Sequence, residues 1–155
     1  MPFDEIIPSL QRGEYEFGVI IHEGQLTWSD YGMHCVLDLG EWWQGITGGL
    51  PLPLGGNIVR KDLGDILCEN IANDIKRSIV YALENPSEVL EFAKQWGRGI
   101  DEDTNRKFVG MYVNDRTIDY GPDGREAIRR FLVQGQQIGL VDESFDVGTI
   151  EFIGE

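Results

Sequence analysis

The chain has 155 residues, of which 41% are hydrophobic and 26% charged. That length is enough for one folded domain with its own core, or for parts of two small lobes. Its 27 acidic residues against 13 lysines and arginines give a formal net charge of -14 at pH 7. An acidic surface repels phosphate groups, which argues against nucleic acid and anionic membranes as partners.

The cysteines and the first residues indicate a cytoplasmic location. Cys35 and Cys68 lie far apart and outside any zinc-binding spacing, so we expect both to be reduced and structural. The N-terminal residues lack the basic and apolar pattern of a secretory signal, and no apolar run is long enough to span a bilayer. We therefore expect no metal and no membrane association.

The first predicted elements are a helix, Asp4 to Arg12, and a strand, Phe17 to Ile21. Asp4 suits the N-cap of the helix, and Gly13 suits its C-terminal stop. The strand is a short run of β-branched and aromatic residues between glycines, which predicts a strand buried on both faces. Because the chain starts at the helix, the strand that should precede it in a crossover unit is absent.

A histidine, His22, directly follows this predicted strand, with Glu23 and Gly24 after it. In open α/β sheets, ligands bind beyond the carboxyl ends of the strands. An imidazole in that position titrates near neutral pH and could act as a base. The alternative is a strand-end histidine that only caps a carbonyl or faces water.

A second strand is expected at Cys35–Leu39. Two adjacent tryptophans, Trp42 and Trp43, follow it, and we expect them to pack rather than to line a ligand site.

The stretch Gly48–Gly56 contains four glycines and two prolines and cannot form a helix. Without the lysine and hydroxyl of a phosphate loop, it is best interpreted as an extended crossing between two lobes. It would lead into a third strand, Asn57–Arg60.

The remainder is expected to be helical. Apolar residues every four positions predict a long amphipathic helix, Asp65 to Glu84. A second helix is expected from Pro86 to about Trp96, with a break at 97–99. A third is expected to be capped by Asp101 or Asp103, with Phe108, Val109 and Tyr112 inward. A loop at Asn114–Gly124, a helix from Pro122 to about Gln137, and a tail, Val147–Ile153, that is a weak strand or disordered, are expected to follow. The loop has only part of a calcium-loop pattern, because Tyr120 stands where that motif needs glycine.

Several of these segments together resemble the 1,4-dihydroxy-6-naphthoate synthase family of the futalosine route to menaquinone. The match runs from Pro2 to about Val141. The matching segments are Phe3–Pro8, Gly18–Glu23, Asp38–Trp43, Thr47–Gly56, Arg60–Gly64, Ser78–Leu83 and Met111–Asp115. The combination of the His-Glu strand end with the Leu-Pro-Leu-Pro-Leu-Gly-Gly connector is the most specific part of it.

The resemblance implies an α/β fold, the two-lobed fold of type II periplasmic binding proteins, here incomplete and with a helix-rich C-terminal part. Residues 1–49 would form part of the second lobe, and residues 50–155 the returning part of the first. Family members have a long N-terminal segment before the first helix. Its absence predicts exposed sheet edges and apolar faces that aggregate or recruit a partner.

The resemblance also implies a lyase that converts cyclic dehypoxanthine futalosine to 1,4-dihydroxy-6-naphthoate without a cofactor. His22 would be the general base. The candidate contacts of the small-molecule carboxylate substrate are Glu23, Leu54, Gly55 and Gly56. Activity would need the N-terminal part, supplied as a separate half, and the chain could also pair with a second copy of itself.

Two alternatives remain open at this point. One is a non-enzymatic solute-binding relative that shares the fold and binds a small carboxylate, since fold does not fix chemistry. The other is an inactive fragment with no function of its own.

Overall fold

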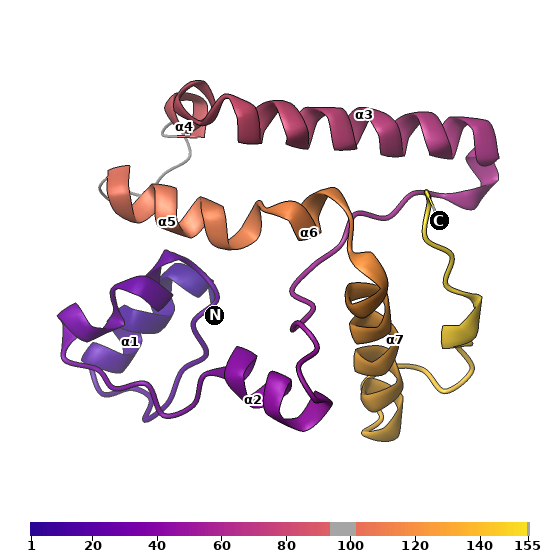
Figure 1. Cartoon of the computed structure of the whole chain (residues 1–155). Coiled ribbons are helices and arrows are strands. Elements are labelled where there is room, and N and C mark those ends of the chain that lie inside the picture. Colours follow the sequence, from indigo (N-terminus) through magenta and orange to yellow (C-terminus); the bar gives the residue numbers. More distant parts are fainter. Residues whose placement is uncertain (94–101, 155) are drawn as a thin grey trace. The chain divides into compact units, whose positions relative to one another are not determined.

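The computed structural model describes residues 1–93 and 102–154. The chain divides into two units, described separately below: residues 1–37 with 87–112, and residues 38–86 with 113–155. In the described part, helices are joined by irregular segments, and no residue belongs to a β-strand (Figure 1). The end of the helix expected near Trp96, the break at 97–99 and the cap at Asp101 lie outside the described residues.

The first unit is built from short helices. They are η1 (Phe3–Glu5), α1 (Ile6–Gln11), η2 (Glu23–Leu26), η3 (Trp28–Tyr31), α4 (Pro86–Ala93, starting at the unit boundary) and α5 (Glu102–Tyr112). The predicted first helix is confirmed as η1 followed by α1. Asp4 is not its cap, because the helix starts one residue earlier, at Phe3, and Pro2 precedes it. Gly13 follows the helix with a φ of 72°, a conformation that favours glycine.

The three predicted strands are wrong for the described chain. Residues 17–21 and 57–60 are irregular, and the segment Cys35–Leu39 fails because Leu39 begins helix α2. There the Asp38 carboxylate accepts a hydrogen bond from the Glu41 amide at 3.0 Å and caps the helix. A segment with the composition of a strand forms a strand only when the backbone of a neighbouring segment pairs with it. The two-lobed α/β fold therefore stays a prediction, as does its division at residue 50.

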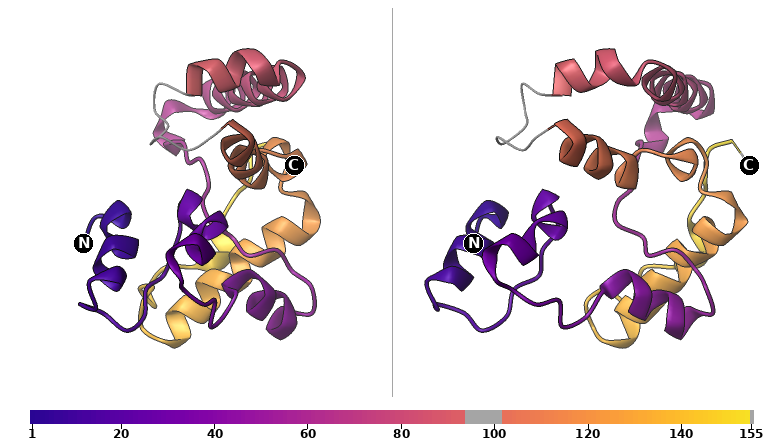
Figure 2. Two further views of the ribbon diagram at one scale, coloured as in Figure 1. Left: turned by 90° about the vertical axis from the view of Figure 1, so that its left-hand side faces the viewer. Right: turned by 60° about the vertical axis from the view of Figure 1, so that its left-hand side comes forward.

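The second unit contains the longer helices. They are α2 (Leu39–Thr47), η4 (Lys61–Leu63), α3 (Asp65–Glu84), α6 (Asp115–Ile118), α7 (Gly121–Gln137) and η5 (Val147–Thr149). The predicted helix Asp65–Glu84 coincides with α3, and the last predicted helix starts one residue after α7 does. The tail lies against α7 through η5 rather than forming a strand (Figures 1 and 2).

The loop expected at Asn114–Gly124 is also wrong, because it contains α6 and the start of α7. A capping box begins α6: the Asn114 side chain accepts from the Arg116 amide at 3.0 Å, and the Thr117 hydroxyl accepts from the Asn114 amide at 3.1 Å. This reciprocal cap satisfies two backbone donors and stabilises a helix of a single turn.

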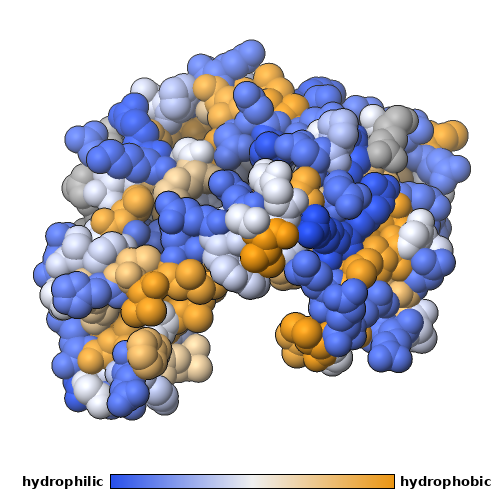
Figure 3. All heavy atoms as spheres, turned by 60° about the horizontal axis from the view of Figure 1, so that its bottom comes forward, coloured by the Kyte–Doolittle hydropathy of each residue, from blue (hydrophilic) through white to orange (hydrophobic). Residues whose placement is uncertain are grey.

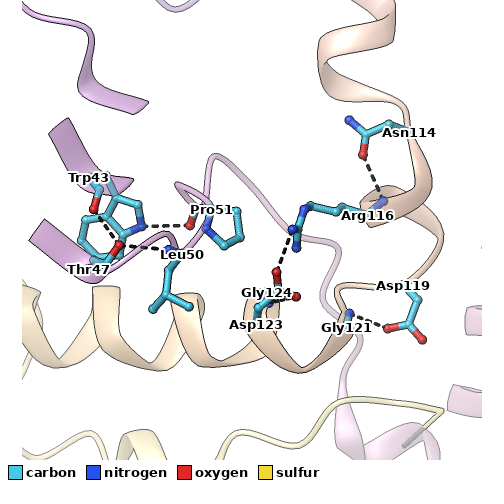
Figure 4. A network of polar contacts seen from close by, with 10 residues as sticks. All are labelled: Trp43, Thr47, Leu50, Pro51, Asn114, Arg116, Asp119, Gly121, Asp123 and Gly124. Carbon is cyan, nitrogen blue, oxygen red and sulfur yellow. Dashed lines mark hydrogen bonds and ion pairs between the residues drawn. The ribbon is translucent and has the colours of Figure 1, made fainter. Parts of the chain in front are cut away.

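The buried centre of the second unit is Trp43, whose side chain is 1% exposed. Its indole Nε1 donates to the Pro51 carbonyl at 2.9 Å, and its ring meets Phe131 edge-on at 5.5 Å. The Thr47 hydroxyl donates to the Trp43 carbonyl at 2.6 Å and accepts from the Leu50 amide at 3.2 Å (Figure 4). This network ties the beginning of the glycine–proline connector to α2. The prediction that a tryptophan packs here is confirmed for Trp43.

Many large apolar side chains are exposed, and they lie between hydrophilic areas of the surface (Figure 3). On α3, Cys68 is the one residue in the buried class, while Ile66 is 79% exposed. The predicted helix is therefore present, but its apolar stripe is incompletely covered. Cys68 fits the structural role expected for it, whereas Cys35 is exposed. Within the described residues, no helix has the length and apolar character needed to cross a membrane.

Replacing Trp43 with alanine is expected to destabilise the second unit by about 3–5 kcal/mol, because it removes a fully buried ring and leaves a cavity. Chemical denaturation measures the free energy of unfolding. The matched control is Trp42→Ala, because Trp42 is the adjacent tryptophan on the same helix and is 47% exposed. An equal loss in both variants would contradict the assignment of Trp43 as the centre of this core.

Candidate functional site

His22 is held at the N-terminus of η2 in the first unit. Its Nδ1 atom accepts a hydrogen bond from the Gly24 amide at 2.9 Å, which makes His22 the side-chain cap of this turn. Its side chain is 13% exposed, and its ring lies 5.5 Å from the ring of Phe3. The imidazole is therefore fixed and mostly covered. The alternative of a histidine that caps a carbonyl or faces water differs from the observed contact, in which the Gly24 amide donates to the imidazole.

This hydrogen bond determines the tautomer of the neutral ring. A nitrogen that accepts from an amide carries no proton, so the proton of the neutral imidazole lies on Nε2. The Nε2 atom is buried and has no hydrogen-bond partner among the described residues. In this arrangement the ring can donate a hydrogen bond to a ligand through Nε2. It can accept a proton there only after its own proton moves to Nδ1.

Glu23 lies beside the same nitrogen. Its Oε2 atom is 3.9 Å from His22 Nδ1, and its side chain is 21% exposed. A carboxylate at this distance favours a proton on Nδ1, because that form attracts the negative charge. The Gly24 amide and the Glu23 carboxylate thus favour opposite tautomers of one imidazole. Glu23 was expected to contact substrate, but its observed neighbour is the histidine.

Gly24 is required by the packing around His22. An ideal Cβ atom on Gly24 would lie 2.5 Å from His22 Cε1 and 2.7 Å from Ile7 Cδ1. These distances are shorter than a carbon–carbon contact permits, so only glycine allows the turn to approach both the imidazole and α1.

A second polar network supports this loop from α5 and was not foreseen from the sequence. Gln25 Nε2 donates to the Tyr112 hydroxyl at 2.9 Å and to the His22 carbonyl at 3.1 Å. The Tyr112 hydroxyl also donates to the Ile21 carbonyl at 3.3 Å. Tyr112 was expected to point inward, but no local pattern reveals a partner 87 residues away. The two side chains fix the backbone on both sides of the His22 α-carbon.

The other candidate residues, Leu54, Gly55 and Gly56, lie in the second unit. Leu54 is 68% exposed. The amides of Gly55 and Gly56 have no hydrogen-bond acceptor among the described residues, and a Cβ on Gly56 would lie 2.9 Å from the Tyr120 hydroxyl. The candidates therefore form two groups: His22 with Glu23 in one unit, and the connector in the other.

The charged residues near the connector are paired. Arg60 forms an ion pair with Asp62, and Lys61 with Glu151, so surface packing accounts for both cations. Two acidic residues of the calcium-like pattern are also engaged, since Asp119 accepts from the Gly121 amide at 2.8 Å and Asp123 from Arg116 at 2.7 Å (Figure 4). Within the described residues, no group of three or more potential ligands is arranged around a metal position.

Comparison with known proteins places the chain in a family. Residues 1–137 match the family model described as menaquinone biosynthesis. Because this match covers most of the chain, the chain belongs to that family of biosynthetic proteins. The family expected from the sequence segments is confirmed.

Named relatives agree with this placement. The chain is 37% identical over 142 residues to a 1,4-dihydroxy-6-naphtoate synthase of Thermus thermophilus, covering 92% of this chain and 52% of the relative. It is 36% identical over 141 residues to a protein of the same name from Streptomyces coelicolor, covering 91% of this chain and 50% of the relative. The chain thus spans about half the length of these curated relatives.

A crystal structure of an Archaeoglobus fulgidus protein is also similar. It matches with a TM-score of 0.86 and 40% sequence identity, over 91% of this chain and 53% of the other. The helical arrangement of this chain therefore recurs inside a polypeptide of about twice the matched length.

Gly24→Ala is expected to displace the imidazole of His22, because the added methyl group would occupy the space of its Cε1 atom. NMR of the His22 ring in the otherwise unchanged chain measures this displacement. Gly45→Ala is the control, since a Cβ there meets nothing within 4 Å inside α2 and should leave the ring signals unchanged. Unaltered His22 signals in Gly24→Ala would contradict the packing described for η2.

The hydrogen bond from Arg116 lowers the pKa of Asp123 below its ordinary value. A depressed native pKa stabilises the fold above the unfolded value of about 3.9, and this contribution is lost as the pH falls through the native pKa. Arg116→Gln is therefore expected to raise the Asp123 pKa towards its ordinary value. Carbon-13 NMR titration of the Asp123 carboxyl measures it, and an unchanged midpoint in the variant would show that Arg116 is not the cause.

Proposed function

We propose that this chain forms part of a cytoplasmic lyase of menaquinone biosynthesis. The reaction is the conversion of cyclic dehypoxanthine futalosine to 1,4-dihydroxy-6-naphthoate. The observation that carries the proposal is the match to two relatives named 1,4-dihydroxy-6-naphtoate synthase over more than nine-tenths of the chain. The substrate would be a small carboxylate, for which the amides of Gly55 and Gly56, without a backbone acceptor in the described part of the chain, are candidate donors.

His22 is proposed as the general base. Support comes from its fixed position, its mostly covered side chain and the buried Nε2 atom, which has no hydrogen-bond partner among the described residues. Proton acceptance at Nε2 requires the tautomer with a proton on Nδ1. That tautomer gives up the Gly24 hydrogen bond and gains the Glu23 carboxylate, whose oxygen already lies 3.9 Å away. Glu23 is thus proposed to orient the base rather than to bind the like-charged substrate carboxylate.

We propose that turnover requires the part of the relatives' length that this chain does not match. The chain covers about half of each relative, and it contributes candidate residues from two separate units. The rest of the relatives' length, carried by the same or another polypeptide, would provide the other contacts of the substrate.

The preparation contains this chain together with a polypeptide that corresponds to the unmatched part of its relatives. In it, His22→Ala is expected to lower kcat by about 10²–10⁴-fold, the usual contribution of a general base. His34→Ala is the matched control, because His34 is the chain's other histidine and is exposed. Product formation is followed with cyclic dehypoxanthine futalosine. If His22→Ala retains the wild-type rate, His22 is not the base.

Glu23→Gln separates orientation from substrate binding. Loss of the orienting carboxylate should lower kcat with little change in KM, whereas a lost substrate contact should mainly change KM. If the reconstituted wild-type protein binds the substrate but forms no product, the chain is a solute-binding relative and the enzyme proposal fails.

A further inference from the structure

The hydroxyl group of Tyr120 lies against the end of the glycine–proline connector. An ideal Cβ atom on Gly56 would lie 2.9 Å from this oxygen, so the phenol reaches the backbone of one of the two glycines whose amides are candidate donors. Within the described residues the hydroxyl makes no hydrogen bond, and Gly56 is exposed. A phenolic hydroxyl can donate to a carboxylate. The connector therefore has a side-chain donor beside it whose hydrogen-bonding capacity is unused.

Two contacts fix the ring of Tyr120 and with it the position of the hydroxyl. The first turn of α7 packs closely on the residue, because a Cβ atom on Gly124 would lie 3.0 Å from the Cβ atom of Tyr120. Phe152, from the C-terminal tail, meets the ring edge-on, with 6.0 Å between the ring centroids and 78° between the planes. An edge-to-face pair of this kind is a favourable aromatic arrangement.

Phe152 is itself anchored. The guanidinium carbons of Arg129 and Arg125 lie 5.1 and 5.8 Å from its ring centroid, which is within the range of a cation–π interaction. Its neighbour Glu151 forms an ion pair with Lys61, in η4, at 2.9 Å. The family match covers residues 1–137. The tail contact that orients Tyr120 thus comes from a segment outside the family match.

The charges around Tyr120 favour an anion, although the chain as a whole is strongly acidic. The acidic residues nearest to it in the sequence, Asp119 and Asp123, are both ion-paired with arginines. Arg129 has no ion pair within the described residues. Tyr120 also directly precedes α7, and the N-terminal end of a helix dipole attracts negative charge. A ligand carboxylate would therefore be attracted to this end of the connector.

We propose that Tyr120 is a substrate-binding residue that donates its hydroxyl hydrogen to the substrate carboxylate, beside the amides of Gly55 and Gly56. This proposal rests on the proposed function, which supplies the carboxylate. Hydrogen bonds to an ionised acceptor are stronger than those between neutral groups. Because the carboxylate is still present in the naphthoate product, it is not the reacting group, and its contact serves binding. Phe152 is the positioning residue that acts through Tyr120.

The test is Tyr120→Phe in the preparation that contains this chain and the unmatched part of its relatives. Calorimetry with 1,4-dihydroxy-6-naphthoate should show a Kd raised by at least about tenfold, because a hydrogen bond to a charged group is lost. With cyclic dehypoxanthine futalosine, KM should rise while kcat changes little. An unchanged Kd would overturn the proposal.

Tyr15→Phe is the matched control. It removes the same hydroxyl from a tyrosine that is 55% exposed and lies in the first unit. Its affinity should stay within about twofold of the wild type, as for other surface substitutions. Equal weakening by both variants would contradict a specific contact at Tyr120.

A double-mutant cycle separates binding by Tyr120 from general support of the fold. Phe152→Ala should weaken binding in the wild type but add little in the Tyr120→Phe background, because both changes remove one contact. Additive losses would show that Phe152 does not act through Tyr120. Carbon-13 NMR of Tyr120 Cζ gives a direct signal, which should shift as the naphthoate is added. A signal that stays unmoved at saturation overturns the proposed contact.

The outcomes for the site and for the reaction are distinguishable. Weaker binding by Tyr120→Phe in a preparation that forms no product refutes the reaction and leaves the site intact. Product formation with unchanged Kd and KM in the variant refutes the site and leaves the reaction intact. A wild-type preparation that binds neither compound refutes both.

Discussion

The hydrogen bond from the Gly24 amide to Nδ1 of His22 is the interaction on which the candidate site depends. It holds the imidazole against the η2 turn and leaves the buried Nε2 atom without a hydrogen-bond partner among the described residues. The bond exists because residue 24 lacks a Cβ atom, which would clash with both the ring and Ile7 of α1. Tyr112, from α5, fixes the backbone just before the histidine. Segments distant in sequence thus converge on one ring.

The sequence predicted the parts of the fold that depend on local information. The helix α3 follows from its apolar period. The non-helical character of the stretch from Gly48 follows from its glycines and prolines, and Gly48 and Gly49 have φ angles of 76° and 105°, which favour glycine. The strands could not be predicted in the same way. Residues 17–21 have the composition and alternation of a strand, but a strand also needs a partner backbone. The described chain provides none, so the same residues form an ordered but unpaired segment.

The residues of the candidate site could likewise be predicted only where the local sequence marks them. His22 could be identified because it follows an apolar run and matches a family segment, both of which are readable in the sequence. The contribution of Tyr112 could not be identified from the sequence, because its partners lie about 90 residues earlier and no local pattern marks them. The role of Glu23 needed geometry as well. In sequence it is simply the residue after the histidine, whereas in the structure its carboxylate lies beside the nitrogen whose protonation decides whether His22 donates or accepts.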